Sequence, residues 1–229
     1  MSEANWLKEH PHAQELVWQL GGTSVTRTKI GRRKLRLFAC GCCRLIWPQL
    51  DDSRLRDTVE VAERFADGQA TATELSAAGS VAQATIPRNA HDFSDDDPNA
   101  QIHAAVAMVV STTLVKPYSA AFGVTAYPMA FAGHRGGQKE ADTLICALLR
   151  DIFGNPFRPV KVNKRWHTGT AVSLARGMYE SRDFSAMPIL ADALQDAGCD
   201  NDDILTHCRD PKQVHVRGCW AVDLVLDKK

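Results

Sequence analysis

Apolar residues recur at helical spacing along almost the whole chain, and this pattern constrains the fold more than any other feature. Residues 138–153 show it most clearly, with apolar positions at Leu144, Ile145, Leu148, Leu149, Ile152 and Phe153. The same period predicts further helices over 5–20, 33–50, 51–68, 99–115, 170–182, 187–197, 202–209 and 218–226, and another that begins near residue 71. The last range also fits a strand. We therefore predict an all-α fold with little or no sheet.

Glycine and proline separate the predicted helices and leave short connections between them. Residues 116–137 contain glycine, proline and alanine, and their pattern assigns no element. The sequence holds no internal repeat and no low-complexity tract. We predict one compact multi-helix domain over residues 1–229.

Composition excludes two classes of protein and predicts a compartment. The 229 residues include 27 basic and 27 acidic side chains, which excludes a strongly basic nucleic-acid coat and an acidic disordered tail. The first ten residues lack the apolar core of a secretory signal, and the apolar run at 104–110 is far shorter than a membrane span. Seven cysteines, an odd number, fit reduced thiols. We expect a cytoplasmic protein that does not bind membranes.

Several long motifs resemble one bacterial family. They are RKLRLFACGCCR at 33–44, VEVAERFADG at 59–68, LRDIFGNPFRPV at 149–160, PILADALQDAGC at 188–199 and HVRGCWAVDL at 215–224. The chain is similar in these motifs to a large paralogous family of planctomycete bacteria. The resemblance covers most of the chain except a variable middle segment at about 70–138. It implies a lineage and supplies no mechanism.

Cysteine and histidine residues are the strongest candidates for a chemical site. Cys40 and Cys43 lie three residues apart, so a helix places both on one face. His207 and other cysteine and histidine residues near the C-terminus add further ligands of the kind that tetrahedral zinc uses. The predicted zinc ligands are Cys40, Cys43, Cys208, His215 and Cys219, with His207 as an alternative. The other interpretation is that these cysteines are small apolar side chains at helix contacts.

Charge is unevenly distributed along the chain. Residues 1–50 hold eight basic and three acidic side chains, whereas residues 51–100 hold four basic and eleven acidic ones. The basic cluster at 27–36, which includes Arg32, Arg33 and Lys34, would contact nucleic-acid phosphates. It would otherwise form a solvated helix face or pair with the acidic helix at 51–67.

Three further segments invite a functional interpretation. Residues 157–167 are aromatic and basic, and Arg158, Arg165 and Trp166 are residue types that often dominate protein interfaces. The alternative is a strap across the helices with its aromatic rings in the core. The acidic segment 87–98 would hold Ca²⁺ or Mg²⁺, or would be a solvated loop. The glycine-rich segment 133–139 would cradle a phosphate, or would be a connector.

Three hypotheses of function follow from these candidates. The first is a non-catalytic, cytoplasmic protein-interaction or regulatory module whose partner is another protein, because no nucleotide loop, catalytic triad or cofactor motif stands out. The second is a metalloprotein that binds zinc through its cysteine and histidine residues, for structure or for hydrolysis. The third is nucleic-acid binding through residues 27–36.

Overall fold

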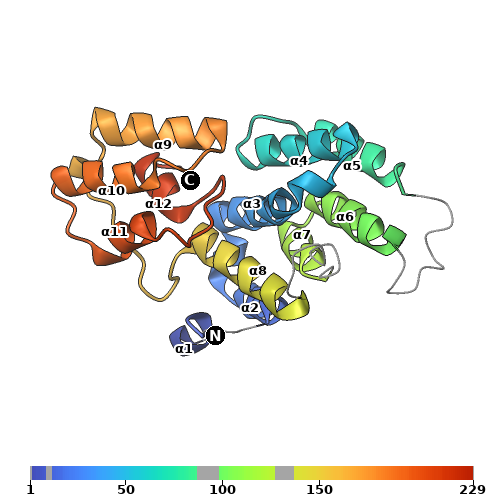
Figure 1. Cartoon of the computed structure of the whole chain (residues 1–229), viewed down its shortest axis with the longest axis horizontal. Helices are drawn as coiled ribbons and strands as arrows, with labels where there is room; N and C mark the ends of the chain where they lie inside the picture. The colour runs from blue at the N-terminus through green and yellow to red at the C-terminus, as the bar shows by residue number, and fades with distance from the viewer. Residues whose placement is uncertain (1, 9–11, 87–97, 127–136, 229) are drawn as a thin grey trace. The chain divides into compact units, whose positions relative to one another are not determined.

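The structure is a computed structural model that describes residues 2–8, 12–86, 98–126 and 137–228 (Figure 1). About 69% of the structure is helical, and its described residues contain no strand, which confirms the predicted all-α class. Within these residues no helix is both long and apolar enough to cross a lipid bilayer. The predicted sites at 87–98 and 133–139 lie wholly or largely outside the described residues.

The chain divides into two compact units, residues 1–146 and residues 147–229, with the boundary inside one helix. The single domain over residues 1–229 stays a prediction. The first unit holds α1 (Glu3–Trp6), α2 (Ala13–Gly21), α3 (Lys29–Leu45), α4 (Ser53–Ala66), α5 (Ala72–Gln83), α6 (Pro98–Thr112), α7 (Pro117–Val124) and most of α8 (Gly137–Phe153). Short 3₁₀ turns at Ser24–Arg27 and Trp47–Gln49 flank α3.

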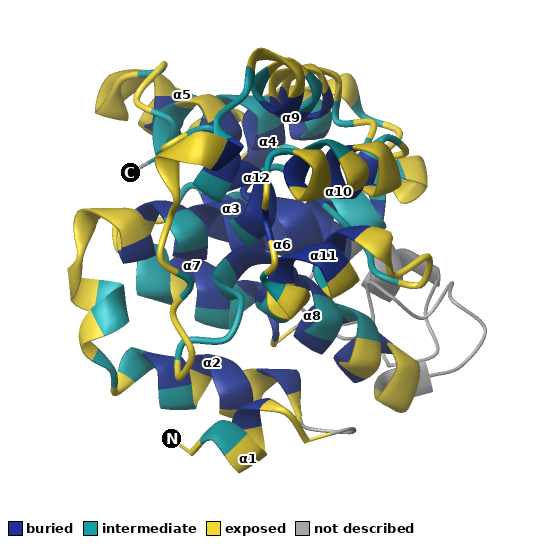
Figure 2. Cartoon of the chain, turned by 90° about the vertical axis from the view of Figure 1, so that its left-hand side faces the viewer, coloured by how far each residue is buried: buried dark blue, intermediate teal, exposed yellow. Residues whose placement is uncertain are grey.

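Helix α3 is the centre of the first unit. It packs against α4, α6 and α7, and most of its side chains are buried (Figure 2). The helix begins at Lys29, earlier than the predicted residue 33, because the Thr28 hydroxyl accepts a hydrogen bond from the Gly31 N–H and caps it. Pro48 lies in the 3₁₀ turn after the helix. Apolar burial around α3 therefore supplies the core of this unit.

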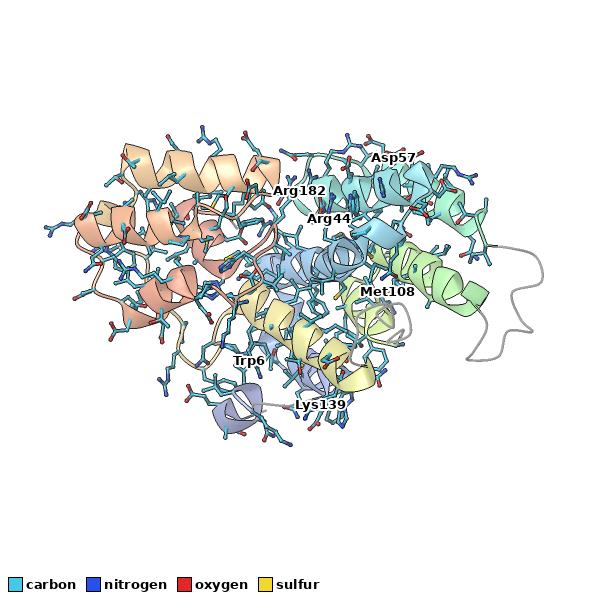
Figure 3. The ribbon with its side chains drawn as sticks, viewed as in Figure 1. Trp6, Arg44, Asp57, Met108, Lys139 and Arg182 are labelled. Atoms are coloured by element: carbon cyan, nitrogen blue, oxygen red, sulfur yellow. The ribbon has the colours of Figure 1, made fainter. Side chains whose placement is uncertain are left out.

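Two arginines of α3 pair with carboxylates of the acidic segment that follows. Arg33 Nε donates to Asp67 Oδ1 at 2.9 Å. Arg44, labelled in Figure 3, donates from Nε and Nη2 to both oxygens of the buried Glu63, each at 2.9 Å. One alternative given for the basic cluster at 27–36 was pairing with the acidic helix at 51–67. Arg33 makes such a pair with Asp67.

The second unit contains the end of α8 and four further helices. These are α9 (Gly169–Ser181), α10 (Met187–Asp196), α11 (Asp202–Arg209) and α12 (Trp220–Val225), with a 3₁₀ turn at Lys164–Trp166. The range 218–226, which fits either period, is therefore a helix. Helices α9, α10, α11 and α12 enclose a separate hydrophobic core that includes Met178, Leu190 and Ile204. The Thr168 and Asn201 side chains cap α9 and α11.

All seven cysteines are buried and none forms a disulfide. Four lie in the first unit and three in the second. Most of them fit the interpretation that places them as small apolar side chains at helix contacts, since free cysteine is among the most buried residue types. Cys219 lies beside the imidazoles of His207 and His215.

Candidate metal centre

Four ligand-type side chains meet in the second unit. They are Asp151 from the last turn of α8, His207 from α11, His215 from the loop between α11 and α12, and Cys219, the N-cap residue of α12. One ligand atom of each lies within 4.8 Å of the others. Among the described residues this is the one group of three or more such side chains that could hold a metal ion.

The Asp151 carboxylate lies at the centre of the group. Its Oδ1 is 2.8 Å from His215 Nδ1 and 3.2 Å from His207 Nε2. Its Oδ2 accepts a hydrogen bond from the Val216 N–H at 3.0 Å. The Cys219 sulfur is 3.3 Å from His207 Nε2 and 3.8 Å from His215 Nδ1. Each imidazole therefore turns one nitrogen toward the same point.

Local backbone features hold these side chains in place. Helix α8 ends two residues after Asp151, and Gly154 follows in the left-handed region with φ 63°. The Trp220 ring lies over Gly154 and is 5.1 Å from the His207 ring. The Gln213 side chain donates to the Val214 carbonyl at 3.0 Å and to the Ala147 carbonyl at 3.4 Å, which ties the loop to α8.

The protonation of the centre follows from burial and hydrogen bonding. Burial alone would raise the pKa of Asp151, but hydrogen bonds from His207 and His215 outweigh it and hold the pKa below its usual value. Burial raises the pKa of the Cys219 thiol well above its usual value, and the nearby Asp151 carboxylate adds to this shift. Without a metal ion, the carboxylate is therefore ionised and the thiol keeps its proton.

Three of the distances between ligand atoms are close to those of a tetrahedral zinc site. A tetrahedron with the usual zinc–ligand bond lengths places its nitrogen, oxygen and sulfur atoms about 3.2 to 3.7 Å apart. The distances of 3.2, 3.3 and 3.8 Å match this spacing, and the 2.8 Å contact between His215 and Asp151 is slightly shorter. Carboxylate, imidazole and thiolate are all zinc ligands. The residues present therefore fit a zinc ion.

The same group is poorly arranged for a cysteine nucleophile. A catalytic cysteine needs a lowered pKa, whereas burial raises the pKa of Cys219. A catalytic triad also uses the two nitrogens of its histidine separately, one toward the nucleophile and one toward the orienting acid. In His207 the same Nε2 faces both the Cys219 sulfur and the Asp151 carboxylate. This convergence is typical of a metal site.

The structure brings together only part of the predicted zinc set. His215 and Cys219 belong to the group, as does the alternative ligand His207. Cys208 follows His207 directly on α11, but it is not in the group, and burial raises the pKa of its thiol to about 12. Cys40 and Cys43 are buried on α3 of the first unit and are not in the group either. The group of four ligand-type side chains includes none of these three cysteines.

Asp151 is the member of the group that the sequence analysis missed. It lies more than fifty residues before the other three, inside the clearest amphipathic helix of the chain. One signal was present, because a carboxylate in the last turn of a helix meets the negative end of the helix dipole. Such a residue needs donors or a cation nearby, and this one is fully buried.

The predicted interface residues and the residues of the basic cluster differ in how far they are buried. Trp166 is only 6% exposed and belongs to the core of the second unit, so this ring is not a surface contact. The sequence-based prediction of Trp166 as an interface residue is corrected on this point, whereas Arg158 and Arg165 are exposed. In the basic cluster, Arg32 is exposed, Lys34 is half-buried, and Arg33 is buried against Asp67.

We compared the chain with protein-family models, with curated proteins and with solved structures, and found no match in any of the three comparisons. The geometry of the second unit is therefore the basis of the functional argument.

Proposed function

We propose that residues 147–229 form a zinc-binding helical module in which Asp151, His207, His215 and Cys219 hold the metal. The observation that carries this proposal is the convergence of four ligand atoms from α8, α11, the following loop and the start of α12. A hydrogen-bonded cluster could form around Asp151 without metal. Such a cluster accounts for the two imidazoles, but it would not require the Cys219 sulfur to lie 3.3 and 3.8 Å from the same two nitrogens.

The zinc in this proposal is structural. Structural zinc sites have four protein ligands, whereas catalytic sites keep one position open for water. The side chains of Asp151, His207 and His215 are 0%, 12% and 7% exposed, and Cys219 is fully buried. A fourth protein ligand and this burial leave no position for a reacting water. The metal would tie together helices that are distant in sequence.

For the whole chain we propose a non-catalytic interaction or regulatory role in the cytoplasm, with another protein as the partner. The closed metal site supports this proposal, since it offers no reacting position.

Elemental analysis of untagged protein, purified without chelator, tests the metal directly. We expect about one zinc per chain in the wild-type protein. Cys219→Ala and His215→Ala should lose it. Cys208→Ala is the matched control, since it removes a buried thiol from the same unit outside the group, and it should keep the metal. Cys43→Ala should keep the metal too.

Cobalt substitution tests the ligand set. Co²⁺ bound by this group should show the strong visible bands of a tetrahedral site and a sulfur-to-metal charge-transfer band that Cys219→Ala abolishes. If the wild-type protein binds neither Zn²⁺ nor Co²⁺ when reconstituted, the metal proposal is wrong, and the group is a hydrogen-bonded cluster around Asp151. Loss of metal in Cys208→Ala but not in Cys219→Ala would show that the ligand set is wrong.

A further inference from the structure

A pocket of about 430 Å³ lies in the first unit, remote in sequence from the metal ligands. Residues of α3, α4, α5 and α6 and of the segment after α6 line it. Its walls combine apolar side chains, including Leu75 and Val110, with the hydroxyl groups of Ser76, Ser80 and Thr113. A pocket of this size and mixed lining suits a small molecule.

Among the described residues, one cation lines this pocket, the guanidinium-bearing side chain of Arg36, which is only 2% exposed. Arg33 and Arg44, the neighbouring inward-facing arginines of α3, each pair with a carboxylate of the segment 63–67. In the described part of the chain, the hydrogen bonds of Arg36 go only to the carbonyl oxygens of Thr112 and Leu114. Of these three arginines, Arg36 is therefore the one without an anionic partner among the residues that the structure describes.

The two carbonyl hydrogen bonds do not use all the donors of Arg36. A guanidinium carries five N–H donors, and two carbonyl oxygens accept from Arg36 Nη1 and Nη2. The Phe65 ring, 5.1 Å from the guanidinium carbon, also lines the pocket and supplies only a weak cation–π contact. Burial lowers the pKa of Arg36, which reflects a charge withdrawn from water. A buried charge is normally paired, and an anion in the pocket would pair this one.

We infer that this pocket binds a small monoanion with an apolar tail, such as an aliphatic carboxylate, whose head group pairs with Arg36. A single cation in the lining matches a single negative charge, whereas a phosphate dianion would remain half neutralised. The apolar wall formed by Leu75, Val110 and their neighbours would hold the tail. Carboxylate and guanidinium also share a bidentate geometry.

Isothermal titration calorimetry of the full chain with sodium octanoate and with 1-octanol tests this inference. The two probes share a tail and differ in charge. We expect saturable binding of one octanoate per chain with a Kd below about 1 mM, and binding of 1-octanol at least tenfold weaker. Equal affinity for the two probes, or no saturable binding of octanoate, would overturn the inference.

Variants locate the site without removing Arg36, which also caps the end of α6. Ser80 is exposed on α5 and lines the pocket, so Ser80→Phe should fill it and weaken octanoate binding at least tenfold. Val81→Phe is the matched control, because Val81 is 45% exposed on the same helix and does not line the pocket. Unchanged binding in Ser80→Phe, or equal loss in both variants, would place the ligand elsewhere and contradict the inference.

Discussion

The two units of the chain are stabilised in different ways. The first is built on long helices, since α3, α4 and α6 have 17, 14 and 15 residues, and two arginines of α3, Arg33 and Arg44, pair with carboxylates in or just after α4. In the second, α11 and α12 have only 8 and 6 residues, and the group of four ligand-type side chains lies between them. Helices this short are marginal by themselves. We therefore expect apolar packing to suffice for the first unit, whereas the second needs a further link.

The largest expected effect is that of metal removal. Chelation of zinc from the full chain should abolish protection against hydrogen exchange for the amides of α11 and α12, and leave that of α3 unchanged. We expect the second unit to lose about 3 kcal/mol or more of stability, because a ligand present at a hundredfold excess over its Kd contributes this much. Unchanged protection of α11 and α12 after chelation would contradict the proposal that the second unit depends on a metal and the first does not.

Glu63→Gln tests the charge pairing of the first unit. The substitution leaves the Arg44 guanidinium without its bidentate carboxylate, so we expect a loss of about 2–3 kcal/mol in chemical denaturation. Glu60→Gln is the control, because Glu60 is half exposed and lies 3.6 Å from the same arginine, and it should cost less than about 1 kcal/mol. Equal effects of the two variants would show that the buried pair adds little.

Gly154→Ala tests the support of the metal centre from the end of α8. Alanine at φ 63° is strained, and its Cβ would lie 3.1 Å from the Trp220 ring, so we expect a loss of about 1–2 kcal/mol. Gly198→Ala, also at a positive φ but in open space, measures the backbone strain alone and should cost about 1 kcal/mol. The difference between the two midpoints of thermal unfolding isolates the contact with Trp220.

Thr71→Ala is expected to have the smallest effect. Thr71 and Glu74 form a capping box at the start of α5, and removal of the hydroxyl should destabilise the protein by about 1 kcal/mol. Denaturation curves that leave the second unit unaffected would sharpen the distinction between the two units. A larger loss than that of Glu63→Gln would contradict the expected ranking of a helix cap below a buried ion pair.

The class of fold and most helix positions could be predicted from the sequence, because helical period and capping residues are local signals. Thr28 shows the limit, since its cap moved the start of α3 by four residues. The candidate metal centre was only partly predictable. His215 and Cys219 stand four residues apart in a loop and at a cap, where the sequence draws attention to them.

The sequence could not show which of His207 and Cys208 belongs to the group, nor that Asp151 does. Adjacent residues on a helix diverge by about 100°, so His207 and Cys208 cannot both face the same centre equally well, but the sequence does not say which one does. Only the packing of α8 beside α11 and the loop shows that the carboxylate of Asp151 takes part. The pocket around Arg36 was equally hidden, since spacing does not reveal which arginine of α3 has no carboxylate partner in the described ranges.

The burial of all seven thiols has a practical consequence. A thiol-reactive reagent should label the native chain slowly, because each sulfur must first be exposed by an opening of the structure. The cysteines divide between the units, with Cys40, Cys42, Cys43 and Cys146 in one and Cys199, Cys208 and Cys219 in the other. The rate at which the cysteines of each unit are labelled therefore reports the local unfolding of that unit. A mass spectrum taken during labelling would show three added groups or four, according to which unit opens first.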